Sequence, residues 1–387
     1  MKPHQNNISL ASIFFPFLRL GLTAFGGPSM VAYIRELSVN KHQWLDEGTF
    51  KNGVALCQSI PGATAIQVAG YVGLKTKGLA GAFASYIGFG LPAFFFMLVL
   101  SWAYMRMGNL SWVISLFNGL QVVVVAIVAN ATFTFGRGTV RQYRDCIVAV
   151  LSASAFWYGI SPFYVVVGAG ISGIILFKAL AEDTKALSYE EGRISLGHLI
   201  IPILITGLFM LVLFLIHRGL FDIALLMMKI DLFAFGGGFA SVPLMLQEVV
   251  NVHGWMDSKT FMDGIALGQV TPGPIVITAT FVGFLTYGIA GAIVATFGIF
   301  NPSFIMLIIG SQVFSRLQRS AIFNRSLKGI LASFVGLLLF VTIKFATAVP
   351  WDIMKLVIVI AAIIALLKRV EILYIVLIGG LISIVLL

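Results

Sequence analysis

The chain has 387 residues, of which 59% are hydrophobic and only 10% charged, and its mean hydropathy is +1.01. That composition excludes an ordinary soluble globular protein and indicates an integral membrane protein. Its apolar runs are long enough to cross the roughly 30 Å hydrocarbon core as helices. The short alternating segments of a β-barrel are not seen. We therefore predict an all-α integral membrane protein embedded in the lipid bilayer.

The formal net charge of +10 lies mainly in two short loops. Their basic residues are Arg137, Arg141, Arg144, Arg316, Arg319, Arg325 and Lys328. Such loops are typical of cytoplasmic anchoring, and no basic domain with interleaved aromatic residues indicates nucleic-acid binding. Cys57 and Cys146 give no disulfide framework, and the five histidines lack metal-ligand spacing. We expect no metal, no cofactor and no catalytic residues.

Thirteen apolar segments are predicted as membrane spans, including a linker helix at 196–217 without a counterpart. In chain order they are 10–35, 53–74, 78–105, 110–135, 146–159, 161–178, 196–217, 222–247, 263–284, 289–311, 329–349, 352–367 and 370–387. The linker separates two groups of six spans. We therefore divide the chain into a first repeat at 8–180, a linker at 181–219 and a second repeat at 220–387.

The two groups of spans are copies of one another. The stretch "LTAFGGPSM" at 22–30 matches "LFAFGGGFA" at 232–240, and "GLAGA" at 78–82 matches "GIAGA" at 288–292. Further pairs follow at nearly the same offset: Trp44 with Trp255, Asp46 with Asp257, Phe50 with Phe261, Gln58 with Gln269, Pro61 with Pro272, and Gly62 with Gly273. The chain is a duplication.

The basic loops predict how the repeats are oriented. If both loops are cytoplasmic, equivalent spans end on opposite sides, which gives inverted repeats with the N-terminus inside and the C-terminus outside. This count assumes that each Pro-Gly segment crosses the membrane once. In the alternative, each segment dips in and returns, and the count then leaves one basic loop outside.

Two helix breaks stand at matched places, in "CQSIPGATAI" at 57–66 and "GQVTPGPIVI" at 268–277. A break frees backbone groups that hydrocarbon cannot satisfy, so it favours a cavity of the kind found in secondary transporters. A helix that resumes after Pro61-Gly62 or Pro272-Gly273 points its positive end at that cavity, which suits an anion. The alternative is a simple packing kink.

The glycine motifs "FGGPS" and "FGGGFAS" let the backbone approach a ligand closely, with the hydroxyls of Ser29 and Ser241 nearby. Close packing of small residues between helices is the alternative for these motifs. Each motif is paired with a break that has a glutamine beside it, Gln58 or Gln269.

Charged residues inside the spans supply further candidates. Arg19 and Lys229 occupy matching positions six residues before the two "FGG" motifs, so we predict counter-charges for a divalent anion, with snorkelling as the alternative. Asp231 is the best-placed carboxylate for coupling, and neutralising Lys229 is its other role. Glu36 and Glu248, at the ends of the motif helices, are candidates for gating or for simple interfacial charges.

The stretches "FGGPSMVAYIRE" with "QSIPGATAIQVAGYVGLKTKGLAGA", and "FGGGFASVPLMLQEVV" with "GQVTPGPIVITATFVG", closely resemble the chromate ion transporter family in its long, two-domain form. The resemblance covers nearly the whole chain. Its motif positions fall on Phe25, Gly26, Gly27, Pro28, Gln58, Pro61, Gly62, Phe235, Gly236, Gly237, Gly238, Gln269, Pro272 and Gly273.

The resemblance implies a bacterial or archaeal inner-membrane protein that exports chromate, with sulfate as a competitor of the same shape and charge. A general sulfate or oxyanion carrier and an anion channel stay open as alternatives. A membrane-embedded chromate reductase is disfavoured, because the sequence has no cofactor motif. A homodimer is left open, since transporters often work in pairs.

Overall fold

The computed structural model describes residues 8–25, 29–108, 110–178 and 196–386, and every regular element in these ranges is a helix. Four helical stretches among them are long and apolar enough to cross a membrane: Thr64–Met107, Ser111–Thr139, Ile275–Phe314 and Ala321–Ala348. Shorter apolar helices accompany them. The prediction of an all-helical membrane protein is therefore confirmed.

The first half contains seven α-helices and a π-helix within the described residues. They are α1 (Leu10–Thr23), α2 (Ser29–Arg35), η1 (Glu36–Lys41), α3 (Glu47–Ser59), α4 (Thr64–Met107), α5 (Ser111–Thr139), α6 (Tyr143–Trp157) and α7 (Pro162–Leu176). Helix α8 (Leu196–Ile216) follows, in the place predicted for the linker helix.

The second half repeats this order. Its elements are α9 (Arg218–Phe233), η2 (Gly238–Ala240), α10 (Ser241–Met245), η3 (Leu246–Val252), α11 (Ser258–Val270), η4 (Ile275–Ile277), α12 (Thr278–Arg319), α13 (Ala321–Ala348), α14 (Ile353–Leu367) and α15 (Ile372–Leu386). A π-helix follows the glycine motif region in each half, and an aspartate, Asp46 or Asp257, caps the next helix by accepting a backbone hydrogen bond.

Helices α4 and α12 each fold back on themselves. Lys77 and Gly78 leave helical geometry inside α4, and Tyr287 and Gly288 do so at the matching place in α12. A Cβ atom on Gly73 would lie 2.1 Å from the carbonyl oxygen of Gly81, so the two arms of α4 run side by side in opposite directions. Each of these long elements is therefore a short arm followed by a long helix.

The chain also turns back at the two Pro-Gly breaks. A Cβ atom on Gly53 of α3 would lie 2.2 Å from the Tyr71 ring in the short arm of α4, and one on Gly264 of α11 would lie 2.5 Å from the Phe281 ring. Residues before and after each break are therefore in contact. We expected these segments to cross the membrane once, whereas each forms the tip of a helical hairpin.

The glycine motif region forms a second hairpin in each half. Phe17 of α1 stacks on Trp44, which follows η1, with 6.1 Å between ring centroids. In the second half, Lys229 of α9 is 3.5 Å from Glu248 of η3. Each half therefore begins with two hairpins side by side, where the sequence predicted single spans at 10–35 and 222–247.

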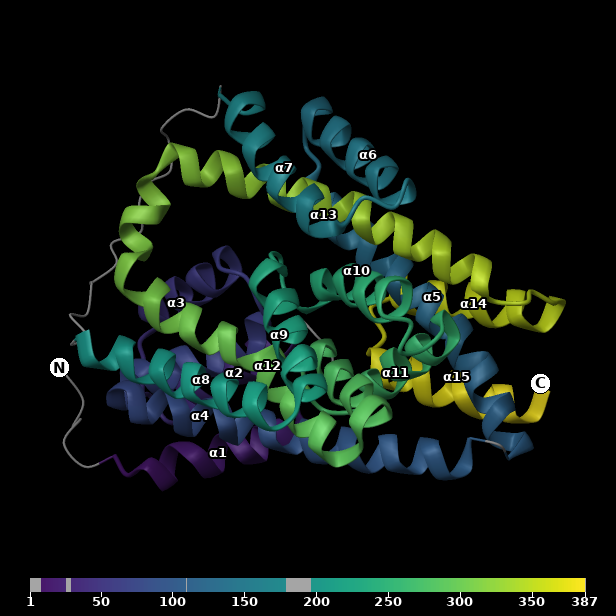
Figure 1. Ribbon diagram of the computed structural model, residues 1–387, viewed down its shortest axis with the longest axis horizontal. Coiled ribbons are helices and arrows are strands. Elements are labelled where there is room, and N and C mark those ends of the chain that lie inside the picture. The colour runs from purple at the N-terminus through teal and green to yellow at the C-terminus, as the bar shows by residue number, and fades with distance from the viewer. Residues whose placement is uncertain (1–7, 26–28, 109, 179–195, 387) are drawn as a thin grey trace.

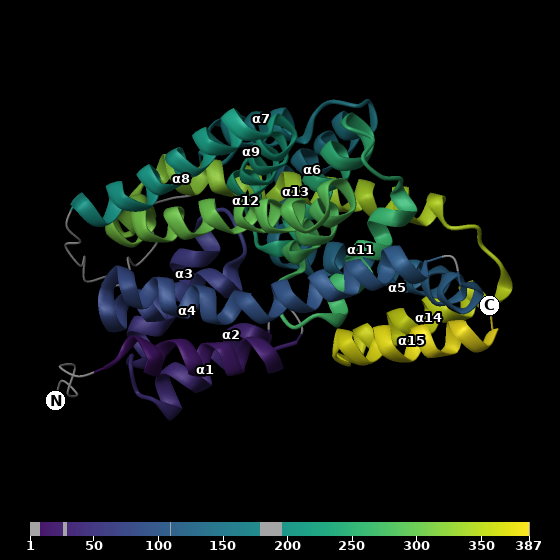
Figure 2. The same ribbon diagram turned by 60° about the horizontal axis from the view of Figure 1, so that its bottom comes forward.

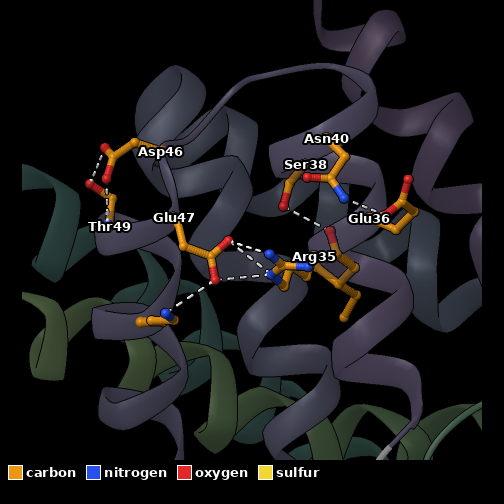
Figure 3. Close-up of polar contacts among 9 residues, drawn as sticks. Arg35, Glu36, Ser38, Asn40, Asp46, Glu47 and Thr49 are labelled. Carbon is orange, nitrogen blue, oxygen red and sulfur yellow. Dashed lines mark hydrogen bonds and ion pairs between the residues drawn. The ribbon is translucent and has the colours of Figure 1, made fainter.

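Arg35 joins the bases of the two hairpins in the first half, away from their tips. Its guanidinium lies 2.7 Å from the Glu47 carboxylate, which also faces Lys51 at 3.4 Å (Figure 3). The Arg35 guanidinium lowers the pKa of Glu47, so this ion pair stays formed at neutral pH. All three side chains are at least partly exposed, so the pair adds little stability and mainly fixes the angle between the hairpins.

Helices α5 and α13 cross near the middle of the molecule and run antiparallel. Thr132 of α5 hydrogen-bonds Thr342 of α13, while Gly136, one turn further along α5, faces Val335, two turns back along α13. The beginning of α1 and the end of α15 lie at opposite ends of the long axis (Figures 1 and 2).

The last two helices of each half pack on the other half. Helices α6 and α7 lie along α13, and α14 and α15 lie along α5 (Figure 1). Glycines allow these helices to pack closely. Gly329 of α13 lies against the carbonyl oxygen of Ala169 in α7, and its counterpart Gly119 of α5 lies against Ser383 in α15. The two halves are therefore interlocked.

The two basic loops lie at one end of the interlocked bundle. Lys328, at the start of α13, is 3.5 Å from the buried carboxylate of Asp145, at the start of α6. Arg325 donates a hydrogen bond to the carbonyl oxygen of Lys178, just after α7. Basic segments that are far apart in the sequence thus share one face of the molecule.

Candidate functional site

The first Pro-Gly tip is buried and in direct contact with the second half. Gly62 adopts φ of +111°, and its N–H donates to the carbonyl oxygen of Ala234, just before the second glycine motif, at 2.9 Å. A Cβ atom on Gly62 would lie 1.8 Å from Ser303 Oγ. Both the backbone angle and the space therefore require glycine here.

A buried polar cluster lies under this tip. Ser303 Oγ donates to Asp231 Oδ1 at 2.9 Å and accepts from the backbone N–H of Ala63 at 3.3 Å. Gln67 Nε2 donates to the carbonyl oxygen of Pro61 at 2.6 Å. Asp231, Ser303 and Gln67 are each at most 1% exposed.

Two acceptor atoms of this cluster have no hydrogen-bond partner among the described residues. They are Asp231 Oδ2 and Gln67 Oε1. An unsatisfied buried acceptor costs about 1–3 kcal/mol, so the two acceptors beside this helix tip call for an explanation.

The second Pro-Gly tip repeats the first with the halves exchanged. Gly273 adopts φ of +132°, and a Cβ atom there would lie 2.7 Å from the Cβ of Ala93 in α4. Ala93 is the counterpart of Ser303, so each tip packs on the long arm of the other half's hairpin helix. Pro272 and Gly273 are buried, as are Pro61 and Gly62.

The second glycine motif lies between the helices that resume after the two tips. Gly236 and Gly237 have φ of +96° and +97°. The Cβ position of Gly237 is 3.4 Å from Thr64 Oγ1, at the start of α4, and that of Gly238 is 2.9 Å from Ile275, at the start of η4. The loop therefore lies against the beginnings of both resuming helices.

In the first motif, Gly26, Gly27 and Pro28 lie outside the described residues. Phe25 is partly buried, and Ser29 Oγ donates to its carbonyl oxygen at 2.9 Å. In the second motif, Phe235 is partly buried, and Ser241 Oγ donates to the carbonyl oxygen of Gly238 at 2.6 Å. In this conformation both hydroxyl donors are thus used to hold the motif backbone.

The symmetric cations lie away from this buried centre. Arg19 is exposed on α1. Lys229 is 46% exposed, pairs with Glu248 and lies 3.7 Å from the centroid of the Phe163 ring. The partner of Lys229 is Glu248, whereas Asp231 bonds Ser303.

The other predicted polar residues divide between surface and interior. Gln58 and Glu36 are exposed, and Glu36 accepts a hydrogen bond from Asn40 (Figure 3). Gln269 is partly buried, and Glu248 is only 6% exposed. Of the three glutamines near the tips, the buried one is Gln67, which has no glutamine counterpart in the second half and was therefore missed by comparing the repeats.

A second buried carboxylate was also missed. Asp263 of α11 accepts hydrogen bonds from Tyr104 Oη and from Gln121 Nε2, both at 2.9 Å. Its signal in the sequence is an aspartate inside the apolar run "FMDGIALGQV". Unlike Asp231, both of its carboxylate oxygens are satisfied.

The helix ends at this centre favour an anion, whereas the carboxylate of Asp231 opposes one while it is charged. Within the described residues, no group of three or more histidine, cysteine, aspartate or glutamate side chains could hold a metal ion.

Comparison of the chain with known proteins identifies its family. The family model described as "Chromate transporter" matches residues 11–174 and again residues 221–384. An uncharacterized transporter of Methanocaldococcus jannaschii is 45% identical over 383 residues, covering 97% of this chain and 94% of the relative. No solved structure matches the chain.

Two further relatives have names that give a substrate. A probable chromate transport protein of Synechococcus elongatus is 30% identical over 333 residues, 85% of this chain and 82% of the relative. The chromate transport protein of Cupriavidus metallidurans is 29% identical over 342 residues, 85% of this chain and 80% of the relative. The family is one of transporters and not of enzymes. The chain, a multi-pass membrane protein, therefore belongs to the chromate transporter family.

Proposed function

We propose that the protein exports chromate from the cytoplasm across the inner membrane and that sulfate competes for the same site. The family and the names of two relatives support chromate as the substrate. Sulfate has the same tetrahedral shape and double negative charge, and backbone N–H donors do not distinguish such ions strongly. Competition is therefore expected.

The proposed binding site is the space around the second glycine motif and the two Pro-Gly tips. One observation carries this proposal: Gly237 and Gly238 lie against the beginnings of the two helices that resume after the tips, at Thr64 and Ile275. Both helix ends bring their positive dipole ends to a tetrahedral dianion. The first glycine motif, from Phe25 to Ser29, is proposed to complete the site.

We further propose that the repeats, at 8–180 and 220–387, have inverted topology and are joined by a linker at 181–219. The antiparallel crossing of α5 and α13 and the shared face of the two basic loops support this. The hairpins are compatible with inverted topology. Each half has two hairpins in place of two predicted spans, so the number of membrane crossings per half changes by an even number. The N-terminus is then cytoplasmic.

Export is also the electrically favoured direction. A dianion that leaves a cell with a negative interior gains about 2 × 2.3 kcal/mol per 100 mV of membrane potential. Arg19 and Lys229 stay candidate counter-charges for this path. Both are exposed in the present conformation, so they would meet the ion at an entrance and not at the buried tips.

The test is transport of radiolabelled chromate by the purified protein in sealed liposomes under an imposed potential, with and without excess sulfate. Saturable movement toward the positive side that sulfate inhibits supports the proposal. Tighter competition by sulfate than by chromate itself would indicate a general oxyanion carrier. Non-saturable flux without exchange of trapped ions would indicate a channel. Absence of any flux in intact liposomes with folded protein would overturn the proposal.

A further inference from the structure

Ser303 connects a buried negative charge to a helix end that would otherwise attract an anion. Its hydroxyl donates to Asp231 Oδ1 at 2.9 Å and accepts from the N–H of Ala63 at 3.3 Å. Ala63 is the N-cap of α4, whose first arm runs from Thr64 to the turn at Lys77. The positive end of that arm is therefore already facing a carboxylate.

The other side of this carboxylate is unsatisfied. Asp231 Oδ2 has no hydrogen-bond partner among the described residues, and the same holds for Gln67 Oε1 in the same cluster. Both side chains are at most 1% exposed. Two buried acceptors call for a donor, and a proton on the carboxyl group supplies one directly.

A dianion bound at the Pro61–Gly62 tip would share the Ala63 end of the helix with Asp231. Like charges in a site of low dielectric constant repel strongly, and protonating the carboxylate removes that repulsion. We propose that Asp231 takes up one proton when an oxyanion dianion binds at this tip, so that binding and transport are proton-linked. This inference rests on the proposed function.

The ionisable side chains near Asp231 already have hydrogen-bond or ion-pair partners or are fully buried. We therefore assign the proton uptake to Asp231. Tyr86 of α4 interacts electrostatically with Asp231 and with Cys57 of α3. Tyr86 donates its hydroxyl to the carbonyl oxygen of Phe300, and Cys57 is fully buried. Residues 200–216 of α8 and 241–245 of α10 contribute no titratable group. On its own helix, Lys229 is paired with Glu248.

The first half has no carboxylate and no serine at the matching positions. Asp231 corresponds to Gly21 and Ser303 to Ala93, so the second tip packs on an alanine with no carboxylate behind it. The two tips are therefore alike in backbone and different in charge. One linked proton per bound dianion is expected, from the first tip alone.

The experiment measures proton uptake when chromate is added to the purified full-length protein in weakly buffered detergent solution, at a mildly alkaline pH where chromate is a dianion. A pH indicator reports protons, and equilibrium dialysis on the same samples reports bound chromate. The samples are the wild type, Asp231→Asn, Ser303→Ala, and Asp222→Asn as a control on the exposed face of α9.

The wild type and Asp222→Asn should take up close to one proton per chromate bound. Their affinity should fall as pH rises, by at most about tenfold per pH unit, the limit for one linked proton. Asp231→Asn imitates the protonated state, so it should bind chromate without proton uptake and independently of pH. Ser303→Ala carries the residue of the matched position and should fold. It removes the hydroxyl that donates to Asp231, which favours the protonated carboxyl group even without chromate, so it should take up less than one proton per chromate bound.

Binding without proton uptake in the wild type, or unchanged uptake in Asp231→Asn, would overturn the inference and leave the proposed function intact. Binding that depends on sodium and not on pH, seen when choline replaces sodium, would overturn it in favour of a cation. Absence of chromate binding at every pH would instead be a failure of the proposed function.

Discussion

Thr132 and Thr342 stand 210 residues apart in the chain, at the same position in the two halves, and their hydroxyl oxygens are 3.0 Å apart. A residue that bonds its own counterpart lies on the axis that relates two copies of a structure. This contact lies where α5 and α13 cross. Helices α6 and α7 pack on α13, and their counterparts α14 and α15 pack on α5.

The threonine pair should contribute a small coupling energy. Val substitutions at Thr132, at Thr342 and at both should show a coupling of about 0.5–1 kcal/mol in a double-mutant cycle, as for other hydrogen bonds between membrane helices. The free energy of unfolding in detergent measures this. Strictly additive single effects would show that the two hydroxyls do not bond.

Gly62→Ala should abolish transport. A side chain there needs φ of +111° and would overlap Ser303 Oγ, so the tip must move by more than a bond length. Gly168→Ala in α7, where no atom lies within 4 Å, is the matched control and should transport normally. Initial rates of chromate flux in liposomes distinguish the two. Normal flux in Gly62→Ala would place the substrate path elsewhere.

The packing of α7 on α13 and of α15 on α5 should be sensitive to side-chain size at Gly329 and Gly119. Gly329→Val and Gly119→Val each force a side chain into the facing helix and should destabilise the protein by about 1–3 kcal/mol. Gly138→Ala, in open space on α5, should cost less than either. Thermal unfolding in detergent measures the difference. An effect at one glycine alone would argue against equivalent roles.

Lys229 has two candidate roles, which a pair of variants separates. If it only neutralises Glu248, then Lys229→Ala should impair the protein and Lys229→Ala combined with Glu248→Gln should restore it, because no buried charge is left unpaired. If Lys229 is a counter-charge for chromate, flux should stay low in the double variant. Chromate flux and unfolding temperature are measured on both.

The Asp46 cap should give a pH-dependent part of the stability. Hydrogen bonds from Thr49 lower the pKa of Asp46, which lies in the loop before α3 (Figure 3). A lowered pKa means that the stabilisation is fully present above the ordinary pKa of aspartate and is lost as pH falls from there through the lowered pKa. Asp46→Ala should cost about 1 kcal/mol at neutral pH, and Asp46→Asn should make the stability fall less steeply as pH is lowered. Unfolding of Asp46→Asn that tracks the wild type at every pH would contradict this.

The sequence by itself determined the membrane class, the duplication and the places where helices break. These depend on local chemistry: a proline without an N–H, a glycine free to take positive φ, and runs too apolar for water. Pro61, Gly62, Pro272 and Gly273 could thus be identified as helix breaks of one kind, each paired with a glycine motif.

Only the tertiary structure decided what the chain does at those breaks and which residues meet there. The chain returns after Pro61 and brings the Tyr71 ring against Gly53, where a side chain would overlap the ring, and this contact joins separate helices. Asp231, Ser303 and Gln67 come from three different helices, α9, α12 and α4. A local sequence pattern therefore cannot predict that they lie together. The second half carries a carboxylate, Asp231, where the first half has Gly21. A Cβ atom on Gly21 would lie 2.4 Å from the carbonyl oxygen of Phe89, so packing requires glycine there.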